Sequence, residues 1–352
     1  MKHIKDYVMK GRKPPSPSVL RETAKLLDSG IPIKDISFSM KIPAITIYKW
    51  RSLGWLDLNV LNNPEYDHPK YQDPELSIEK LLDRAEKRFE RLHQAKERNE
   101  WLEYKMKIDG AFGLVFIGDP HIGDQGCNIG LLREHIDIIN KTEGLYGIGL
   151  GDYTNNWAGR LAQRIAPLEE TTRPQTWRLV DWFFKSVDWF LLIKGNHDVW
   201  SGNDDVLEFM YKGAVPIQDW QAKIKILCPN KKEFKVWCAH DFHGHSIYNP
   251  LHGPMRKGKF SGLADVYVAG HKHNWALFHV ENPENKTTYW ASRARGYKFF
   301  DAYANVLGIA EQEHGASVCA IFDPNITGPG SIQMFADIEV ASDYLNWKRK
   351  KA

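Results

Sequence analysis

The stretch FLLIKGNHDVW, residues 190–200, places an apolar run directly against a row of polar side chains. Residues 190–194 predict a buried strand, because successive apolar residues suit a strand that is covered on both faces. Gly195, Asn196, His197 and Asp198 follow at once. Taken alone, a glycine and an asparagine after a strand predict only a turn.

Four other apolar runs end in the same way. GLVFI is followed by Gly118, Asp119, Pro120 and His121, and YGIGL is followed by Gly151, Asp152, Tyr153, Thr154 and Asn155. KVWCA is followed by His240, and DVYVA is followed by Gly270, His271, Lys272 and His273. Ligands of α/β sheets gather outside the carboxyl ends of the strands, and Asp, Asn and His are metal-ligand types. Five such exits in one segment therefore indicate a metal site rather than five turns.

The ordered pattern DxH…GDxxN…GNHD…H…GHxH over residues 112–280 resembles the calcineurin-like metallophosphoesterases. That family includes purple acid phosphatases, protein Ser/Thr phosphatases, cyclic-nucleotide phosphodiesterases, Mre11/SbcD nucleases and phage metallophosphoesterases. The resemblance implies an α/β fold, a layered αββα sandwich of two packed mixed sheets with a binuclear metal centre at one edge. It does not specify the substrate.

Carried onto this chain, the resemblance implies two divalent metal ions, with Mn²⁺ favoured and Fe or Zn²⁺ as alternatives. The implied ligands are Asp119, His121 and His273 for the first ion; Asn196, His240 and His271 for the second; and Asp152 as the bridge between both. The segment HDFHGHS, residues 240–246, also offers His243 and His245. His240 is favoured because it directly follows the apolar run, and His243 remains open because the family often shows His-Gly here.

The resemblance also implies three catalytic roles. His197 matches the position that protonates the leaving oxygen as general acid. Asp198 would orient that imidazole and keep it protonated. Asn155 would help to fix the Asn196–His197 pair or the phosphate.

Two basic segments accompany the motifs. Arg256, Lys257 and Lys259 lie between the last two motifs, and Arg293, Arg295 and Lys298 follow among aromatic residues. Mixed cationic and aromatic segments fit nucleic-acid backbones and bases, which predicts substrate contact. A solvated basic loop is the alternative.

The basic surplus lies at the front of the chain. Residues 1–60 carry 11 Lys and Arg against 5 Asp and Glu, whereas the rest carries 36 against 39. After PPSPS (14–18), the pattern predicts a helix from about Val19 to Gly30 and then a helix-turn-helix resembling phage terminase small-subunit or resolvase types. Its second helix would present Thr46, Lys49 and Arg51 to DNA. A small helical bundle that only packs on the rest is the alternative.

Three further regions follow this predicted DNA-binding domain of residues 1–60. Residues 61–109 combine a Pro- and Asn-containing linker with a long charged helix from about Leu76 to Lys107. Its narrow apolar stripe fits a helix that lies on a partner, such as a second copy of the chain, or on the next domain, and a solvated spacer is the alternative. Residues 110–340 form the phosphoesterase domain, and residues 341–352 form a basic C-terminal tail.

The composition limits the classes of protein. No apolar run approaches the ~18 residues of a membrane span, and MKHIKDYVMKGRK has no signal-peptide pattern. Four scattered cysteines exclude a CxxC zinc site and indicate a reducing compartment, the cytoplasm of a bacterium or phage-infected host. We expect a phosphodiesterase acting on DNA, with a phosphomonoesterase or a DNA-binding regulatory or packaging-associated protein as alternatives.

Overall fold

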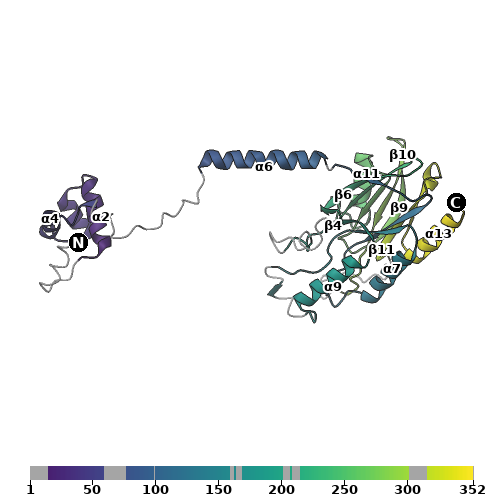
Figure 1. Cartoon of the computed structure of the whole chain (residues 1–352), viewed down its shortest axis with the longest axis horizontal. Helices are drawn as coiled ribbons and strands as arrows, with labels where there is room; N and C mark the ends of the chain where they lie inside the picture. The colour runs from purple at the N-terminus through teal and green to yellow at the C-terminus, as the bar shows by residue number, and fades with distance from the viewer. Residues whose placement is uncertain are drawn as a thin grey trace. The chain divides into compact units, whose positions relative to one another are not determined.

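The computed structural model describes residues 15–58, 77–98, 100–158, 162–163, 169–200, 207, 215–300 and 315–351. Contacts within the chain divide it into two compact units, Met1–Arg88 and Phe89–Ala352 (Figure 1). Most of the predicted linker, residues 61–76, lies outside the described residues. Within the described part of the chain, no helix has both the length and the apolarity needed to cross a membrane.

Within residues 15–58, the first unit has three short helices, α2 (Pro17–Asp28), α3 (Ile33–Met40) and α4 (Ala44–Ser52). The side chain of Ser16 caps α2 by accepting from the backbone N–H of Val19, and Lys41 ends α3 in the left-handed conformation with φ 54°. Ile33, Ile36 and Ile47 are buried together. The predicted pair of helices with its tight turn is present, whereas DNA contact by α4 stays a prediction.

Helix α6 (Ile78–Arg98) is shorter than the predicted helix of residues 76–107. Residues Leu102–Lys105 form strand β1 instead, which pairs in parallel with β6. The segment LEYKMKI alternates apolar and polar residues, and this period of two fits a strand with one covered face. The predicted helix was wrong beyond its first two thirds because its stripe was read through this change of period.

The second unit is built on two six-stranded mixed sheets. The strands are β1 (Leu102–Lys105), β2 (Phe112–Ile117), β3 (Leu145–Gly149), β4 (Trp189–Lys194), β5 (Ile217–Asp219), β6 (Gln221–Leu227), β7 (Glu233–Ala239), β8 (Val266–Ala269), β9 (Ala276–Asn282), β10 (Thr287–Arg293), β11 (Ser317–Phe322) and β12 (Ile332–Phe335). One sheet has the order β1-β6-β7-β8-β10-β9, and the other has the order β12-β11-β2-β3-β4-β5.

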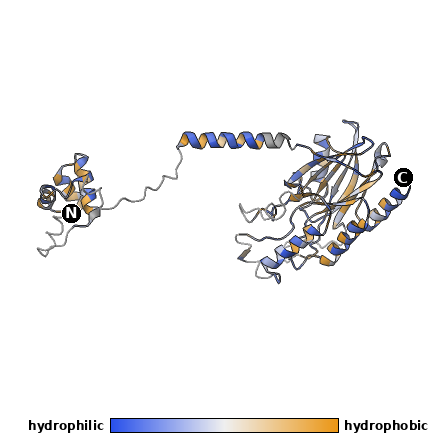
Figure 2. Cartoon of the chain, in the orientation of Figure 1, coloured by the Kyte–Doolittle hydropathy of each residue, from blue (hydrophilic) through white to orange (hydrophobic). Residues whose placement is uncertain are grey.

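The sheets pack face to face, and helices cover their outer faces (Figures 1 and 2). Leu114, Leu191, Ile224 and Val236 belong to the apolar layer between the sheets. Helices α7 (Ile129–Lys141), α9 (Arg173–Lys185) and α13 (Ile338–Lys351) cover the β2–β3–β4 sheet, and α11 (His252–Ser261) covers the other. The predicted layered αββα sandwich is confirmed.

Helix α13 includes residues that the sequence analysis treated as a basic tail from 341 onward. Ala341 and Leu345 are fully buried in the hydrophobic core between the β2–β3–β4 sheet and the helices that cover it. The basic residues Lys348, Arg349, Lys350 and Lys351 make up its last turn, where positive charge favours the helix C-terminus. The run of basic residues at 348–351 drew the tail boundary too early, into the apolar face of this helix.

The strand pairing brings the five polar exits to one rim. Strands β2, β3 and β4 are parallel neighbours in one sheet, and β7 and β8 are parallel neighbours in the other. Parallel neighbours end at the same edge, so Asp119, Asp152 and Asn196 leave one sheet beside His240 and His271 of the other. This edge positions the site.

Candidate metal centre

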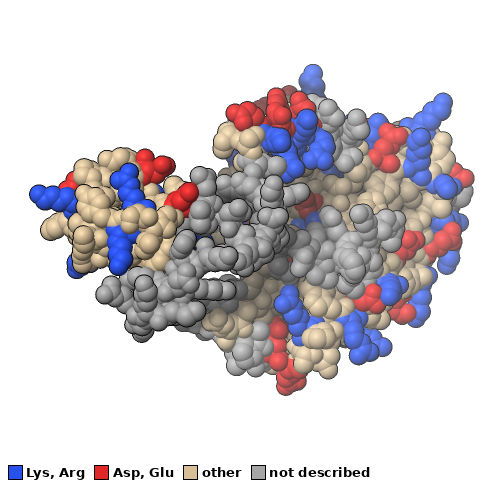
Figure 3. Space-filling view, turned by 60° about the vertical axis from the view of Figure 1, so that its left-hand side comes forward, with Lys and Arg blue, Asp and Glu red and all other residues tan. Residues whose placement is uncertain are grey.

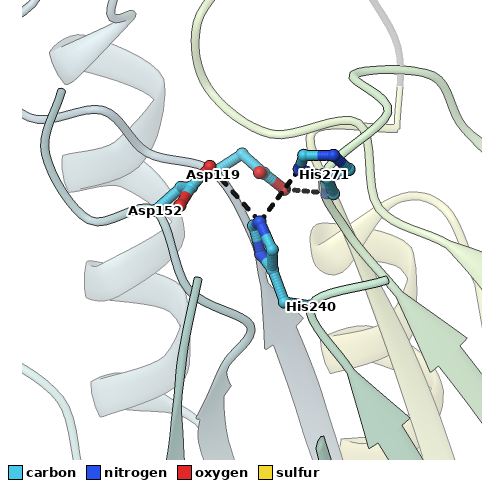
Figure 4. Close-up of side chains that lie close together, drawn as sticks. All are labelled: Asp119, Asp152, His240 and His271. Carbon is cyan, nitrogen blue, oxygen red and sulfur yellow. Dashed lines mark hydrogen bonds and ion pairs between the residues drawn. The ribbon is translucent and has the colours of Figure 1, made fainter. Parts of the chain in front are cut away.

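The centre of the rim is a buried group of two carboxylates and two imidazoles (Figure 4). One ligand atom from each of Asp119, Asp152, His240 and His271 lies within 4.8 Å of the others. His240 Nε2 is 3.3 Å from Asp152 Oδ2 and 3.0 Å from His271 Nδ1. The backbone N–H of His271 donates to Asp119 Oδ2 over 2.7 Å. The strand ends thus bring together side chains from four separate motifs.

Two further groups adjoin this one. Asp119, His121 and His273 form one, and His121, Asp152 and His197 form the other, each with ligand atoms within 4.8 Å. Asn196 reaches the first group through its Oδ1, 3.1 Å from His240 Nε2. All seven side chains predicted as metal ligands therefore meet at one rim, with both carboxylates shared between groups.

Three histidines are held by a hydrogen bond at Nδ1 and turn their other ring nitrogen, Nε2, toward this rim. The Nδ1–H groups of His121, His197 and His240 donate to carbonyl oxygens at 2.8, 2.6 and 2.8 Å. The acceptors are the side-chain and main-chain carbonyls of Asn155 and the main-chain carbonyl of Leu150. Such bonds fix the ring orientation and direct Nε2 toward the rim, as in metal-ligating histidines.

Two buried atoms at the rim are short of a hydrogen-bond partner. Within the part of the chain that the structure describes, neither Asp119 Oδ1 nor His121 Nε2 has one. Asp119 is fully buried, and His121 is 2% exposed. A buried polar atom without a partner costs about 1–3 kcal/mol, and a carboxylate oxygen beside an imidazole nitrogen suits a divalent cation. The histidine and aspartate clusters therefore fit a divalent metal site.

Burial and mutual charge shift the ionisation of this group. Burial raises the pKa of Asp119 to about 8. Although burial opposes it, the carboxylate of Asp152 raises the pKa of His240 to about 9. Burial and the neighbouring His240 lower the pKa of His271 to about 4. Two close carboxylates in low dielectric thus need positive charge between them.

Backbone strain concentrates at the same positions. Ten non-glycine residues of the described chain have positive φ, and five of them are predicted ligands: Asp119, His121, Asp152, His271 and His273, with φ from 45° to 69°. Such conformations are uncommon and cluster at functional sites. A Cβ on Gly270 would collide with Asp119 Oδ2, so this glycine is required by the close approach of the carboxylate.

Among the described residues, the Asp198 carboxylate bonds to backbone groups rather than to the His197 ring, so its predicted orienting role stays a prediction. Its carboxylate accepts three backbone N–H groups, from Asp152 and Gly195 at 2.8 Å and from Tyr153 at 3.1 Å. Burial raises its pKa to about 7. Asp198 therefore ties the exit of β4 to the exit of β3, and the carbonyl of Asn155 orients His197.

The prediction that His197 is held protonated is corrected. Burial lowers the pKa of His197, so the neutral imidazole is favoured at neutral pH. Its Nε2 faces Asp152 Oδ2 at 3.8 Å. Asn155 holds His121 and His197 together rather than the Asn196–His197 pair, and its amide donates to Asp124 and Glu169 at 2.5 and 2.6 Å. The sequence analysis missed these two acids because neither belongs to a motif.

The choice among the histidines of HDFHGHS is clear in geometry. His240 is fully buried at the rim, whereas His243 and His245 are exposed. Neither exposed histidine belongs to a group of metal-ligand atoms within the described residues. His240 directly ends β7, which places it beside His271 at the end of β8.

The predicted substrate-binding cations divide into two pairs. Arg256 is exposed and Lys257 half-buried on α11, with the Lys257 ammonium 4.0 Å from the centre of the Trp237 ring. Arg293 and Arg295 are only 1% and 2% exposed. Arg293 donates to the carbonyls of Pro250 and Gly270 and to Asp241, so direct substrate contact is wrong for it.

Arg295 is likewise enclosed, with its guanidinium 3.9 Å from the centre of the Phe299 ring. Both arginines were read as surface cations because the aromatic neighbours in the sequence suggested a binding loop. On the described part of the face in Figure 3, Lys and Arg are interspersed with Asp and Glu rather than gathered into one basic surface.

Comparison with known proteins reaches solved structures only. No family model and no curated protein matches this chain. The solved structures that it resembles include NAD nucleotidase of Haemophilus influenzae (10% identity, 65% of this chain and 50% of that chain, TM-score 0.35), Vps29 of Entamoeba histolytica complexed with zinc (12%, 64% and 97%, 0.33) and nuclease MPE of Pseudomonas putida (16%, 63% and 87%, 0.30). The match thus spans half of the NAD nucleotidase. At these identities and TM-scores the likenesses say nothing about the substrate.

The chain itself has two packed mixed sheets with helices on both outer faces and five ordered motifs at one rim. In its fold and in the place of its motifs, it is therefore similar to the calcineurin-like metallophosphoesterases.

Proposed function

We propose that this chain is a calcineurin-like, metal-dependent phosphoesterase that hydrolyses phosphodiester bonds, with DNA as the substrate. One observation carries the proposal. The imidazoles of His121, His197 and His240 are each anchored through Nδ1, and each has a ligand atom within 4.8 Å of the buried carboxylate of Asp152. A purely structural polar cluster would be expected to satisfy Asp119 Oδ1 and His121 Nε2 within the protein.

The residues divide the chemistry among them. Asp119, His121 and His273 would hold one divalent ion, and Asn196, His240 and His271 the other, with Asp152 between them. Bound there, two such ions would neutralise phosphate oxygens and lower the pKa of an attacking water.

His197 lies beside Asp152 at the edge of this set, its side chain 13% exposed. The Asn155 carbonyl holds the ring through Nδ1. Nε2 would then protonate the leaving oxygen, which makes His197 the proposed general acid. A general acid must carry a proton, and burial alone disfavours the charged form. The negative phosphate of a bound substrate would raise the pKa of His197 when the proton is needed.

Exposed cations, one near the rim and two on the first unit, support a diester of nucleic acid. Arg256 approaches the loop that follows His240, because its Cδ lies 3.5 Å from the position of a Cβ on Gly244. Lys49 and Arg51 on α4 are exposed in the first unit. Cations of this kind bind phosphate groups without reading sequence.

The test is hydrolysis with Mn²⁺ supplied and chelator as control. Single-stranded DNA, duplex DNA, bis-p-nitrophenyl phosphate and p-nitrophenyl phosphate are compared as substrates. We expect cleavage of DNA and of the diester. Cleavage of the monoester alone would replace the nuclease proposal by a phosphomonoesterase, and metal binding without any hydrolysis would favour a DNA-binding regulatory protein.

His197→Ala separates a general acid from a ligand. As general acid, His197 contributes about 10²–10⁴-fold in rate, so turnover should fall by that factor while bound metal, counted by plasma mass spectrometry, stays unchanged. Loss of bound metal would instead make His197 a ligand, which its place beside His121 and Asp152 would permit. His245→Ala, at an exposed histidine of the HDFHGHS segment (residues 240–246), is the matched control.

A further inference from the structure

A tryptophan stands at the joint between the two sheets, beside the metal-ligand group. Trp220 is the single residue between β5 (Ile217–Asp219) of one sheet and β6 (Gln221–Leu227) of the other. The crossing forces its backbone to φ 60°, a conformation that bulky residues rarely adopt. The indole nevertheless stays 41% exposed instead of entering the core.

The Trp220 ring is held rigidly at the rim. Its backbone N–H donates to Lys194, its carbonyl accepts from His240, and its indole N–H donates to Asp241 at 3.1 Å. The ring centre lies 5.1 Å from that of His240 and 6.2 Å from that of His271. A large flat surface is therefore fixed next to the place where a phosphate would bind, at low entropic cost to a ligand.

Two more indoles stand near His197. The Trp200 ring centre is 3.9 Å from the His197 ring, and the Trp157 ring is 5.4 Å from it. Trp157 is held by an indole N–H bond of 2.6 Å to Glu169. The rim thus has aromatic surface beside the His240–His271 ligands and beside the proposed general acid.

We propose that Trp220 is a stacking platform for an unpaired nucleobase next to the scissile phosphate. This rests on the proposed phosphodiesterase function and narrows its substrate to a single strand or a frayed end, since a paired base is already stacked in the duplex. Every base offers a flat face to an indole, so the platform favours nucleic acid without selecting a sequence. A phosphoester without a base would gain nothing from Trp220.

The test uses two oligonucleotides that differ only in their bases. One is oligothymidylate, and the other carries abasic sites on both sides of the scissile phosphate. Base–aromatic stacking contributes ~1–3 kcal/mol, or about 5- to 150-fold, so Trp220→Ala should lower kcat/KM by this factor on oligothymidylate and by less than about twofold on the abasic strand. Trp220→Phe should recover part of the loss.

Two controls exclude a structural effect. Bound metal is counted in each variant, because Trp220 packs against His240. Trp347→Ala removes a comparably exposed indole, 48% exposed on α13 with its ring against Lys351, and should leave both rates unchanged. An equal loss on both oligonucleotides, or no loss on either, would overturn the platform.

Failure of the proposed function gives a different pattern. If the wild type cleaves neither oligonucleotide, the phosphodiesterase proposal fails while the platform is still decided by binding. Fluorescence anisotropy with Mn²⁺ then measures the affinity of wild type and Trp220→Ala for both strands. If the wild type binds the strand with bases more tightly than the abasic strand and Trp220→Ala binds both equally, the platform is upheld. If the wild type also binds both strands equally, the platform is refuted.

Discussion

Replacing Asp198 by Asn should destabilise the second unit rather than merely slow turnover. The carboxylate accepts three backbone N–H groups that come from the exits of β3 and β4. Oδ2 accepts from Asp152 and Gly195, and Oδ1 accepts from Tyr153. An Asn can turn its single oxygen to the first two donors, but its NH₂ then faces the N–H of Tyr153.

The magnitude follows from that one lost bond. A buried N–H without an acceptor costs about 1–3 kcal/mol. For a unit of this size, each kcal/mol lowers the melting temperature by about 2–4 °C, which gives a fall of roughly 2–12 °C for Asp198→Asn. Asp198→Ala would leave all three donors unpaired, at about 3–9 kcal/mol, enough to threaten folding. The Asn variant is therefore the informative one.

The assay is thermal and denaturant unfolding without added metal, followed by a metal count. Asp137→Asn is the matched control, because Asp137 pairs with Lys141 at an exposed helix surface and such pairs contribute at most about 0.5 kcal/mol. We expect Asp198→Asn to lose stability and, through the shifted Asp152 backbone, metal affinity. Unchanged stability and metal content with lost turnover would refute this reasoning and restore Asp198 as a partner of His197.

Four further predictions concern other parts of the chain. Gly270→Ala should lower metal affinity about 10- to 100-fold in a metal titration, because its Cβ displaces the Asp119 carboxylate, whereas Gly130→Ala on α7 should change nothing. Burial lowers the pKa of His135 to about 4, so as the pH falls the unfolded chain takes up the proton before the folded chain does. The free energy of unfolding should therefore fall by up to about 3 kcal/mol between pH 6.5 and pH 4, and the same pH dependence in denaturant melts of His135→Gln would contradict this. Ile78, Leu82, Phe89 and Leu92 are exposed on α6 at spacings of four, seven and three residues, which puts them on one face, so Phe89→Glu should shift a self-associated chain to monomer in light scattering; an unchanged mass would argue against self-association through α6. Lys49→Ala with Arg51→Ala should weaken DNA binding and reduce its salt slope by ~1–2; equal slopes would remove α4 from the DNA contacts.

The sequence by itself determined the fold class and the chemical character of the rim. Each motif is local: an apolar run that can only be a covered strand, then glycine, then ligand side chains within a few residues. Because parallel neighbours end at one edge, five such exits were enough to predict that Asp119, Asp152 and the histidines would meet. The sequence favoured His240 over His243 because His240 directly follows the apolar run, but left the choice open; the burial of His240 beside the other ligands decided it.

Only the tertiary structure decided what each polar group contacts. Asp198 bonds to backbone groups 45 and 46 residues away, and Asn155 divides its two carbonyls between histidines from different strands. Arg293 is enclosed by acceptors 43 and 52 residues away in the sequence. Residues predicted as the end of a helix instead form β1, because they pair with β6. Trp220 is exposed because the chain changes sheets at that residue. These outcomes depend on strand pairing across long separations, which no local pattern of residues encodes.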